Sequence, residues 1–311
     1  MKPRFIFFGT PKFAVFVLDE LERKNLKPLL VVTAPDKPAG RGLRAAPSPV
    51  KKRAESHGIP VFQPPTLKTA EAAERIAKEH ADVFVVAAYG KMIPADILEL
   101  PTHKTLNIHP SLLPRWRGAD PIRAAILAGD TETGVSIMQL DEKLDHGPIV
   151  AQKSVPIGEK TYEELEGELA RLGGEMIADI LPRWLAGKIE SREQNHDQAT
   201  FTKKITKEDG HLDWNEPAEM IERKIRALNP WPGTYAFWKR GEKMLRLRIL
   251  EARTVSASGK PGTVIPVNDG FAVACANGAI RIKTIQLEGK KATPSAEFAR
   301  GYPDIIGTIL S

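Results

Sequence analysis

The segment Asp82-Val83-Phe84-Val85-Val86-Ala87-Ala88 is apolar at every position after its first residue. A strand with one face in water would alternate polar and apolar side chains, so this run predicts a strand buried on both faces of a parallel sheet. Similar runs precede it at 4–8 and 29–33, and apolar residues at helical spacing occur between the runs. This alternation predicts a Rossmann-like, doubly wound α/β domain with a mostly parallel sheet.

The pattern continues with strands at 105–109, 133–140 and 149–155 and a long helix at 162–185, and it changes after residue 218. Five short strand-like runs with Gly-rich turns follow, at 234–238, 244–252, 262–267, 271–276 and 279–287. Such a series predicts a small OB-like β-barrel. We therefore expect a catalytic domain at 1–189, a polar linker at 190–208 and a C-terminal domain at 209–311.

Composition places the chain among globular proteins and excludes several kinds of site. It has 311 residues, 42% hydrophobic and 27% charged, a length that suggests two domains. The one cysteine, Cys275, excludes a disulfide framework, and the seven histidines include no His-x-x-x-His pair, so we predict no metal site. No apolar run approaches the roughly 18 residues of a membrane span, and the run at 5–8 is too short for a signal peptide. We expect a cytoplasmic protein without a membrane partner.

The charge matters more for its placement than for its total. The net charge is +6, yet residues 24–53 alone hold eight basic residues against Asp36. A second group at 239–248 has five basic residues against Glu242. Such groups favour a polyanionic partner, nucleic acid above all, although solvated surface is the alternative for each. The first group includes the loop at 34–47, which exceeds the usual length of about 2–6 residues. We interpret it as a mobile cationic arm, with an ordinary surface loop as the alternative.

The run Leu106-Asn107-Ile108-His109-Pro110-Ser111 ends a predicted strand, where ligands bind in open parallel sheets. Side chains on a strand alternate, so Asn107 and His109 point to the same side. An amide donor beside an imidazole suits acyl-type chemistry, in which the amide stabilises an oxyanion. Ordinary polar residues at a strand end are the alternative. Ser111 lacks a Gly-x-Ser-x-Gly elbow, which disfavours a serine hydrolase.

Asp145 is the second candidate. It follows the strand at 133–140, and from this we expect it at the same edge as His109. Its carboxylate would accept a proton or orient His109, and an Asx-turn is the alternative. The turn Gly9-Thr10-Pro11 has no Gly-x-Gly-x-x-Gly pattern, so a dinucleotide site is not predicted.

Taken together, these segments resemble a known superfamily. The run from Asn107 to Gly118 resembles the signature of folate-dependent formyltransferases, and Leu144-Asp145-His146-Gly147 is similar to their second motif. Other stretches are similar to the branch that formylates methionyl-tRNA, namely 8–11, 35–42, 88–90, 205–210 and 226–232. The resemblance covers essentially the whole chain. Asp120 departs from it, because the family usually has a small residue there.

The resemblance implies formyl transfer from 10-formyltetrahydrofolate to the α-amino group of methionine on initiator Met-tRNA, by a monomer without a metal. It implies Asn107, His109 and Asp145 as the catalytic trio. The expected folate segment is Ser111, Leu112, Leu113 and Pro114. The basic loop is expected to grip the tRNA acceptor stem through Lys37, Arg41 and Arg44, and the C-terminal barrel is expected to contact tRNA too.

Three other functions stay open at this point. A formyltransferase acting on an amino sugar nucleotide would share the trio but would not need the basic loop. A hydrolase could release formate from the folate. An RNA-binding module could use the same two domains without catalysis.

Overall fold

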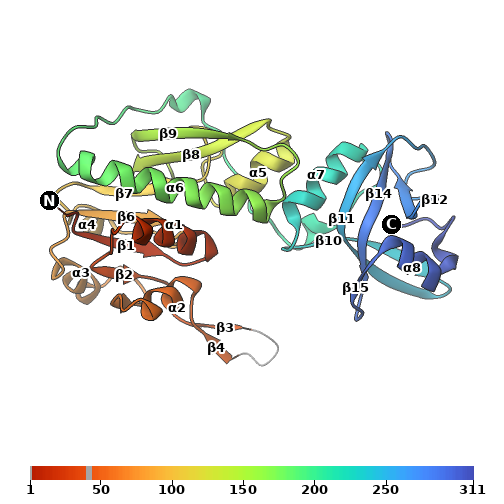
Figure 1. Ribbon diagram of the computed structural model, residues 1–311, viewed down its shortest axis with the longest axis horizontal. Helices are drawn as coiled ribbons and strands as arrows, with labels where there is room; N and C mark the ends of the chain where they lie inside the picture. Colours follow the sequence, from red (N-terminus) through yellow and green to blue (C-terminus); the bar gives the residue numbers. More distant parts are fainter. Residues whose placement is uncertain (1, 40–43) are drawn as a thin grey trace. The chain divides into compact units, whose positions relative to one another are not determined.

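The computed structural model describes residues 2–39 and 44–311, and the chain forms two compact units (Figure 1). The first unit comprises Met1–Pro121, Glu132–Pro156 and Glu163–Thr202. The second comprises Ile122–Thr131, Ile157–Tyr162 and Lys203–Ser311. Among the described residues, no helix combines the length and the apolar character needed to cross a bilayer.

The first unit is built on a seven-stranded sheet of order β5-β2-β1-β6-β7-β8-β9. The pairs β1–β2, β1–β6, β2–β5 and β6–β7 are parallel, whereas β7–β8 and β8–β9 are antiparallel. The predicted α/β fold with a mostly parallel sheet is confirmed. The strands are β1 (Phe5–Gly9), β2 (Leu30–Val32), β5 (Val61–Phe62), β6 (Val83–Ala87), β7 (Thr105–His109), β8 (Glu132–Gln139) and β9 (Ile149–Pro156).

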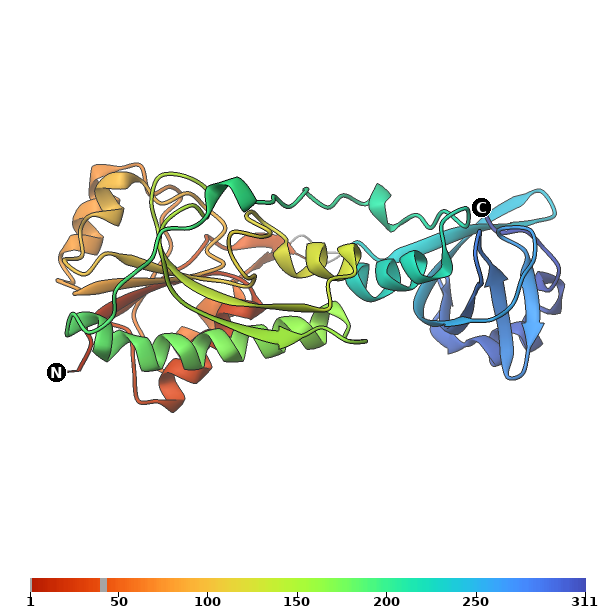
Figure 2. The same ribbon diagram turned by 90° about the horizontal axis from the view of Figure 1, so that it is seen from above.

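Helices cover both faces of this sheet, which is why β1 and β6 are buried at every position. On one face, Ile6 and Phe84 pack in a cluster with Ile76 of α3 (Ala70–Ala77) and Ile97 of α4 (Ala95–Leu98). Figure 2 shows α3, in orange, and α6 (Tyr162–Leu185), in green, on opposite sides of the sheet. The first unit also contains α1 (Lys12–Arg23) and α2 (Pro49–Ser56).

The long basic loop contains regular structure at its described ends. β3 (Lys37–Ala39) and β4 (Arg44–Ala46) pair as antiparallel strands. At the base of this hairpin, Asp36 accepts hydrogen bonds from Lys51 and from Gln63. These bonds hold the pKa of the Asp36 carboxyl below its usual value, with Gln63 the larger cause and Lys51 the second. The sequence analysis expected a mobile cationic arm here, and Arg41 of that arm lies outside the described residues.

The second unit is centred on an antiparallel sheet of order β10-β11-β14-β13-β12, with β15 paired to β14. Its strands are β10 (Thr234–Arg240), β11 (Lys243–Val255), β12 (Val264–Val267), β13 (Gly270–Ala274), β14 (Ala279–Leu287) and β15 (Ala292–Pro294). Register shifts after Ile249 and after Glu251 mark bulges, which bend β11 and help the sheet to curl. The five predicted strands are confirmed.

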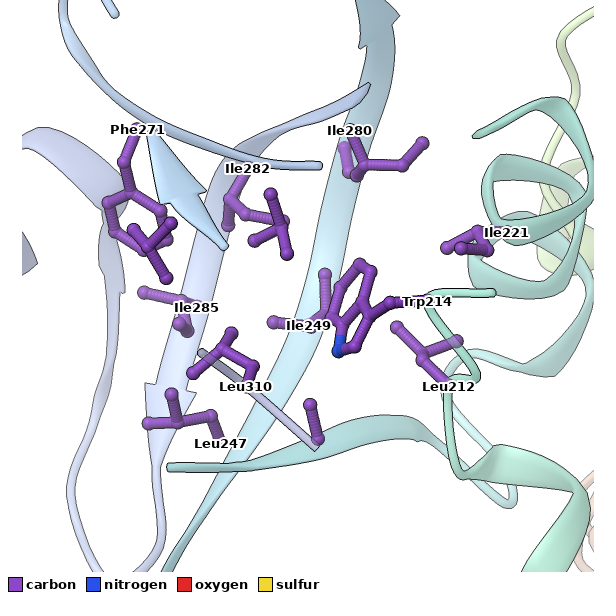
Figure 3. Packing of buried hydrophobic residues seen from close by; sticks show 14 of the residues in the cluster. Leu212, Trp214, Ile221, Leu247, Ile249, Phe271, Ile280, Ile282, Ile285 and Leu310 are labelled. Atoms are coloured by element: carbon purple, nitrogen blue, oxygen red, sulfur yellow. The ribbon is translucent and has the colours of Figure 1, made fainter. Parts of the chain in front are cut away.

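The curled sheet encloses its own apolar core. Trp214, Ile249, Ile280 and Leu310 pack together inside it, and Ile221 reaches them from α7 (Ala218–Leu228) (Figure 3). The unit also contains α8 (Ser295–Gly301) and most of α5 (Pro121–Ala128). This core lies wholly within the second unit, so each unit buries apolar side chains of its own.

Candidate active site

Strand β7 presents Asn107 and His109 from the carboxyl edge of the parallel strands. Val86 of β6 pairs with Asn107, and Ser136 of β8 pairs with His109. Both side chains are buried, with 8% and 4% of their surface exposed. Within the part of the chain that the structure describes, no hydrogen-bond acceptor faces the Asn107 amide. Its N–H groups are therefore available to a ligand.

His109 uses both of its ring nitrogens. Nε2 lies 2.9 Å from the Trp116 carbonyl oxygen, which can only accept, so Nε2 must carry a hydrogen. Nδ1 lies 3.5 Å from Oδ1 of Asp145. The imidazole is thus oriented from both ends.

Asp145 reaches His109 by a route that the sequence did not reveal. β8 runs antiparallel to β7, so its last residue, Gln139, pairs with Leu106 and lies toward the start of β7. The premise that the end of β8 shares an edge with His109 was wrong. The following loop instead returns along the sheet, where the backbone N–H of Gly118 donates to Oδ2 of Asp145 at 2.8 Å. Asp145 itself is 8% exposed.

The segment from Ser111 to Pro114 is held in place by two polar side chains of the neighbouring strands. Ser136 Oγ donates to the Ser111 carbonyl at 2.6 Å and accepts from the Leu113 N–H at 3.0 Å. Gln152 Nε2 donates to the Leu113 carbonyl at 2.7 Å. This loop has a fixed shape beside His109, as a wall of a binding site requires.

The basic group at 24–53 is partly neutralised in the folded chain. Lys51 pairs with Asp36 at 2.9 Å, and Arg53 pairs with Glu22 at 2.6 Å. Lys37 is exposed in β3, and among the described residues it has no ion-pair partner. The cationic surplus of residues 24–53 is therefore smaller in the folded chain than the sequence count.

The second basic group forms part of a mixed aromatic and cationic face. In the antiparallel pair β10–β11, Tyr235 lies opposite Arg248, and Phe237 lies opposite Arg246. The Arg246 guanidinium lies over the Tyr235 ring, 3.7 Å from its centroid. His211 stacks on the same ring at 5.3 Å. Aromatic rings interleaved with arginines are typical of surfaces that bind nucleic acids.

Several residues that shape the site were missed by the sequence analysis. Gln194 is buried, and its amide reaches the carbonyl of Asp145 at 3.0 Å. Arg117 is buried beside it and donates to Gln194 Oε1. Arg117 belongs to the run from Asn107 to Gly118, but nothing in its spacing indicated burial. The polar segment around Gln194 gave no signal other than low apolar content. Within residues 2–39 and 44–311, no group of three or more His, Cys, Asp or Glu side chains could hold a metal ion.

Comparison with family models covers most of the chain. The model described as "Formyl transferase" matches residues 1–181, and "Formyl transferase, C-terminal domain" matches residues 204–303. The chain is 45% identical over 305 residues to the methionyl-tRNA formyltransferase of Marinobacter nauticus, which covers 97% of each chain. It is 44% identical over 309 residues to the methionyl-tRNA formyltransferase of Thermus thermophilus, covering 99% of each.

Among solved structures, the fold is similar to that of HypX from Aquifex aeolicus in complex with tetrahydrofolic acid. The TM-score is 0.64 at 18% identity, and the match covers 96% of this chain and 47% of that one. The chain thus spans about half the length of HypX. At this identity the likeness supports the shared fold.

Proposed function

The chain belongs to the formyl transferase family, in its methionyl-tRNA formyltransferase branch, and from this premise we propose that it formylates the α-amino group of methionine on initiator Met-tRNA, with 10-formyltetrahydrofolate as the formyl donor. The observation that carries the proposal is the similarity to such enzymes along nearly the whole chain. The convergence of Asn107, His109 and Asp145 supports it independently, because amine attack on a formyl group needs an oxyanion donor and a proton acceptor.

The proposed reaction moves one acyl group. The methionine nitrogen attacks the formyl carbon, the carbonyl oxygen becomes an oxyanion, and the bond to the folate nitrogen then breaks. The proton lost by the amine is accepted at Asp145, which then gives a proton to the departing folate nitrogen. Asn107 N–H and His109 Nε2–H are the proposed oxyanion donors. In the present structure His109 Nε2–H donates a hydrogen bond to the Trp116 carbonyl. This bond must break before the same N–H can donate to the oxyanion.

The folate is proposed to bind along the segment Ser111, Leu112, Leu113 and Pro114. Its support is the anchoring by Ser136 and Gln152, which gives this loop a defined shape next to His109. A preformed wall reduces the ordering that binding requires. The folate is a co-substrate here, and it supplies the electrophilic formyl carbon.

The tRNA is proposed to bind through cations in both units. Lys37, Arg41 and Arg44 of the basic loop are proposed for the acceptor stem. The face around Tyr235 and Arg246 on the curled sheet, which we propose to be an OB-like barrel, is suited to a second contact. We propose domains at 1–189 and 209–311 joined by a linker at 190–208, and a monomer that acts in the cytoplasm.

An assay that combines the purified protein, 10-formyltetrahydrofolate and Met-charged initiator tRNA tests the proposal. Formyl-methionine recovered from the tRNA, dependent on both substrates, supports it. Formate released at the same rate without tRNA would indicate a hydrolase. Formylation of an amino sugar nucleotide in place of Met-tRNA would indicate the sugar enzyme, and tRNA binding without turnover would indicate an RNA-binding module. Each of these three outcomes contradicts the proposal.

A further inference from the structure

Residues 191–202, which we call the strap, run along the loops that carry the proposed catalytic groups. Near one end, the Arg192 N–H and carbonyl pair with the carbonyl and N–H of Ile149, each at 2.8 Å. Near the other end, Arg117 N–H donates to the Thr200 carbonyl, and Thr202 N–H donates to the Arg117 carbonyl, also at 2.8 Å. The whole strap belongs to the first unit. It is therefore fixed to both walls of the candidate site.

One strap side chain is directed at the Asp145 turn. Gln194 is 5% exposed, and its Nε2 donates to the carbonyls of Asp145 at 3.0 Å and Gly147 at 2.7 Å. Its Oε1 accepts from Nε of Arg117 at 3.2 Å and from Nη2 at 2.6 Å. Two N–H donors and two lone pairs are all that a carboxamide has, so every one is used. Such a group has a single orientation.

The Asp145 turn needs an external hold. Asp145 has a φ of 47°, in the left-handed region that is strained for any residue other than glycine. A backbone in this state persists only where its surroundings over-determine it. Gln194 bonds the carbonyl of Asp145 itself and that of Gly147, two residues later. The turn that aims the carboxylate at His109 is thereby fixed from the strap.

We propose that Gln194 is a positioning residue for formyl transfer, one that acts by holding the Asp145 carboxylate against His109. This inference rests on the proposed function. Arg117 supports Gln194 in turn, because a buried guanidinium bonded to Oε1 orients the amide and strengthens its N–H donors. In the proposed reaction Gln194 touches neither the amine nor the formyl group, so its effect must pass through Asp145.

The test uses Gln194→Glu in the full chain. Glutamate keeps an acceptor for Arg117, so the buried cation stays paired, but it has no N–H for the two carbonyls and places a negative charge beside them. The matched control is Gln198→Glu, the same chemical change at an exposed strap residue. A misplacement of about 1 Å can cost about 10²-fold in rate. We expect Gln194→Glu to lower kcat by about that factor, with the KM for both substrates within about threefold.

A double variant separates positioning from a general structural effect. In an Asp145→Asn background the carboxylate is already gone, so Gln194→Glu should reduce single-turnover formylation by less than about threefold. A Gln194→Glu enzyme with wild-type kcat would overturn the inference, and so would a full 10²-fold loss that persists in the Asp145→Asn background. If the wild type itself fails to formylate Met-tRNA in the same assay, the proposed function falls, and the inference falls with it.

Discussion

Asn107 and His109 lie two residues apart on β7, yet their side chains differ in whether they have hydrogen-bond partners within the chain. His109 is bound at both nitrogens, to Trp116 and toward Asp145, whereas the Asn107 amide has no acceptor among the described residues. A donor without an internal partner needs no bond broken when an oxyanion forms beside it. Asn107 is therefore the more fully prepared of the two proposed oxyanion donors.

Replacing Asn107 by alanine should reduce turnover far more than substrate binding. Loss of one oxyanion donor typically costs about 10²–10³ in rate, because the bond is made in the transition state and not in the ground state. Steady-state kinetics of Asn107→Ala should show a fall in kcat of that size, with the folate KM within about threefold. Asn195→Ala, at an exposed strap residue, is the control. Equal losses in folate binding and in kcat would argue against this role.

Cys275 offers a prediction that concerns stability and pH. The thiol is 3% exposed, and burial raises its pKa from 9.0 to about 11, partly offset by a hydrogen bond from the Ile280 backbone. Between these two values the unfolded chain releases a proton that the folded chain keeps, so rising pH favours unfolding. Urea titrations at pH 8 and pH 10 should show a larger loss of unfolding free energy for the wild type than for Cys275→Ala. Equal losses would contradict the assignment.

At the scale of elements, the helix behind the site is as important as the strand that carries it. α6 approaches β7 so closely that a Cβ at Gly173 would lie 2.5 Å from Cγ2 of Ile108. Ile108 stands between Asn107 and His109 and points to the opposite face. Any displacement of Ile108 would therefore move the two residues on either side of it.

Gly173→Ala should destabilise the chain, and Gly167→Ala should not. Overpacking of this kind costs about 1–3 kcal/mol, and part of the strain should reach β7 and lower kcat. At Gly167, in the same helix, a Cβ would meet only the Arg171 side chain at 3.5 Å, an ordinary contact. Alanine there should raise the free energy of unfolding by about 0.5–1 kcal/mol through helix propensity. Urea unfolding of the two variants checks both signs, and equal effects would refute the close-packing argument.

The same scale shows what sequence patterns could and could not predict. Unbroken apolar runs located β1, β2 and β6 because burial on both faces removes polar residues from them. The direction of β8 could not be predicted, because side chains alternate with a period of two in parallel and antiparallel strands alike. The strap was read as part of a linker because it is polar. Composition does not distinguish a polar side chain that faces water from a buried one such as Gln194, which donates a hydrogen bond to a strained turn.

At the scale of the whole molecule, folding redistributes the charge that first suggested a polyanionic partner. The net charge of +6 is smaller than the surplus of seven counted within residues 24–53. In the folded chain, acidic partners take up Lys24, Lys51 and Arg53. Among the described residues of this segment, Lys27, Lys37 and Lys52 have no ion-pair partner, and Arg41 lies outside the described residues. An electrostatic grip on tRNA by this surplus must therefore depend on few residues.

A combined Lys37→Ala, Arg41→Ala and Arg44→Ala variant should bind Met-tRNA more weakly and with a flatter dependence on salt. Each cation that contacts a phosphate contributes about 0.7–0.9 to the slope of log K against log salt, so the triple variant should lose about 2–3 units of slope. The folate KM should not change, because the folate is proposed to bind elsewhere. The control removes three exposed lysines outside the segment, Lys2, Lys78 and Lys188. A wild-type slope in the first variant, or an equal loss in the control, would show that tRNA binding depends on total charge and not on this loop.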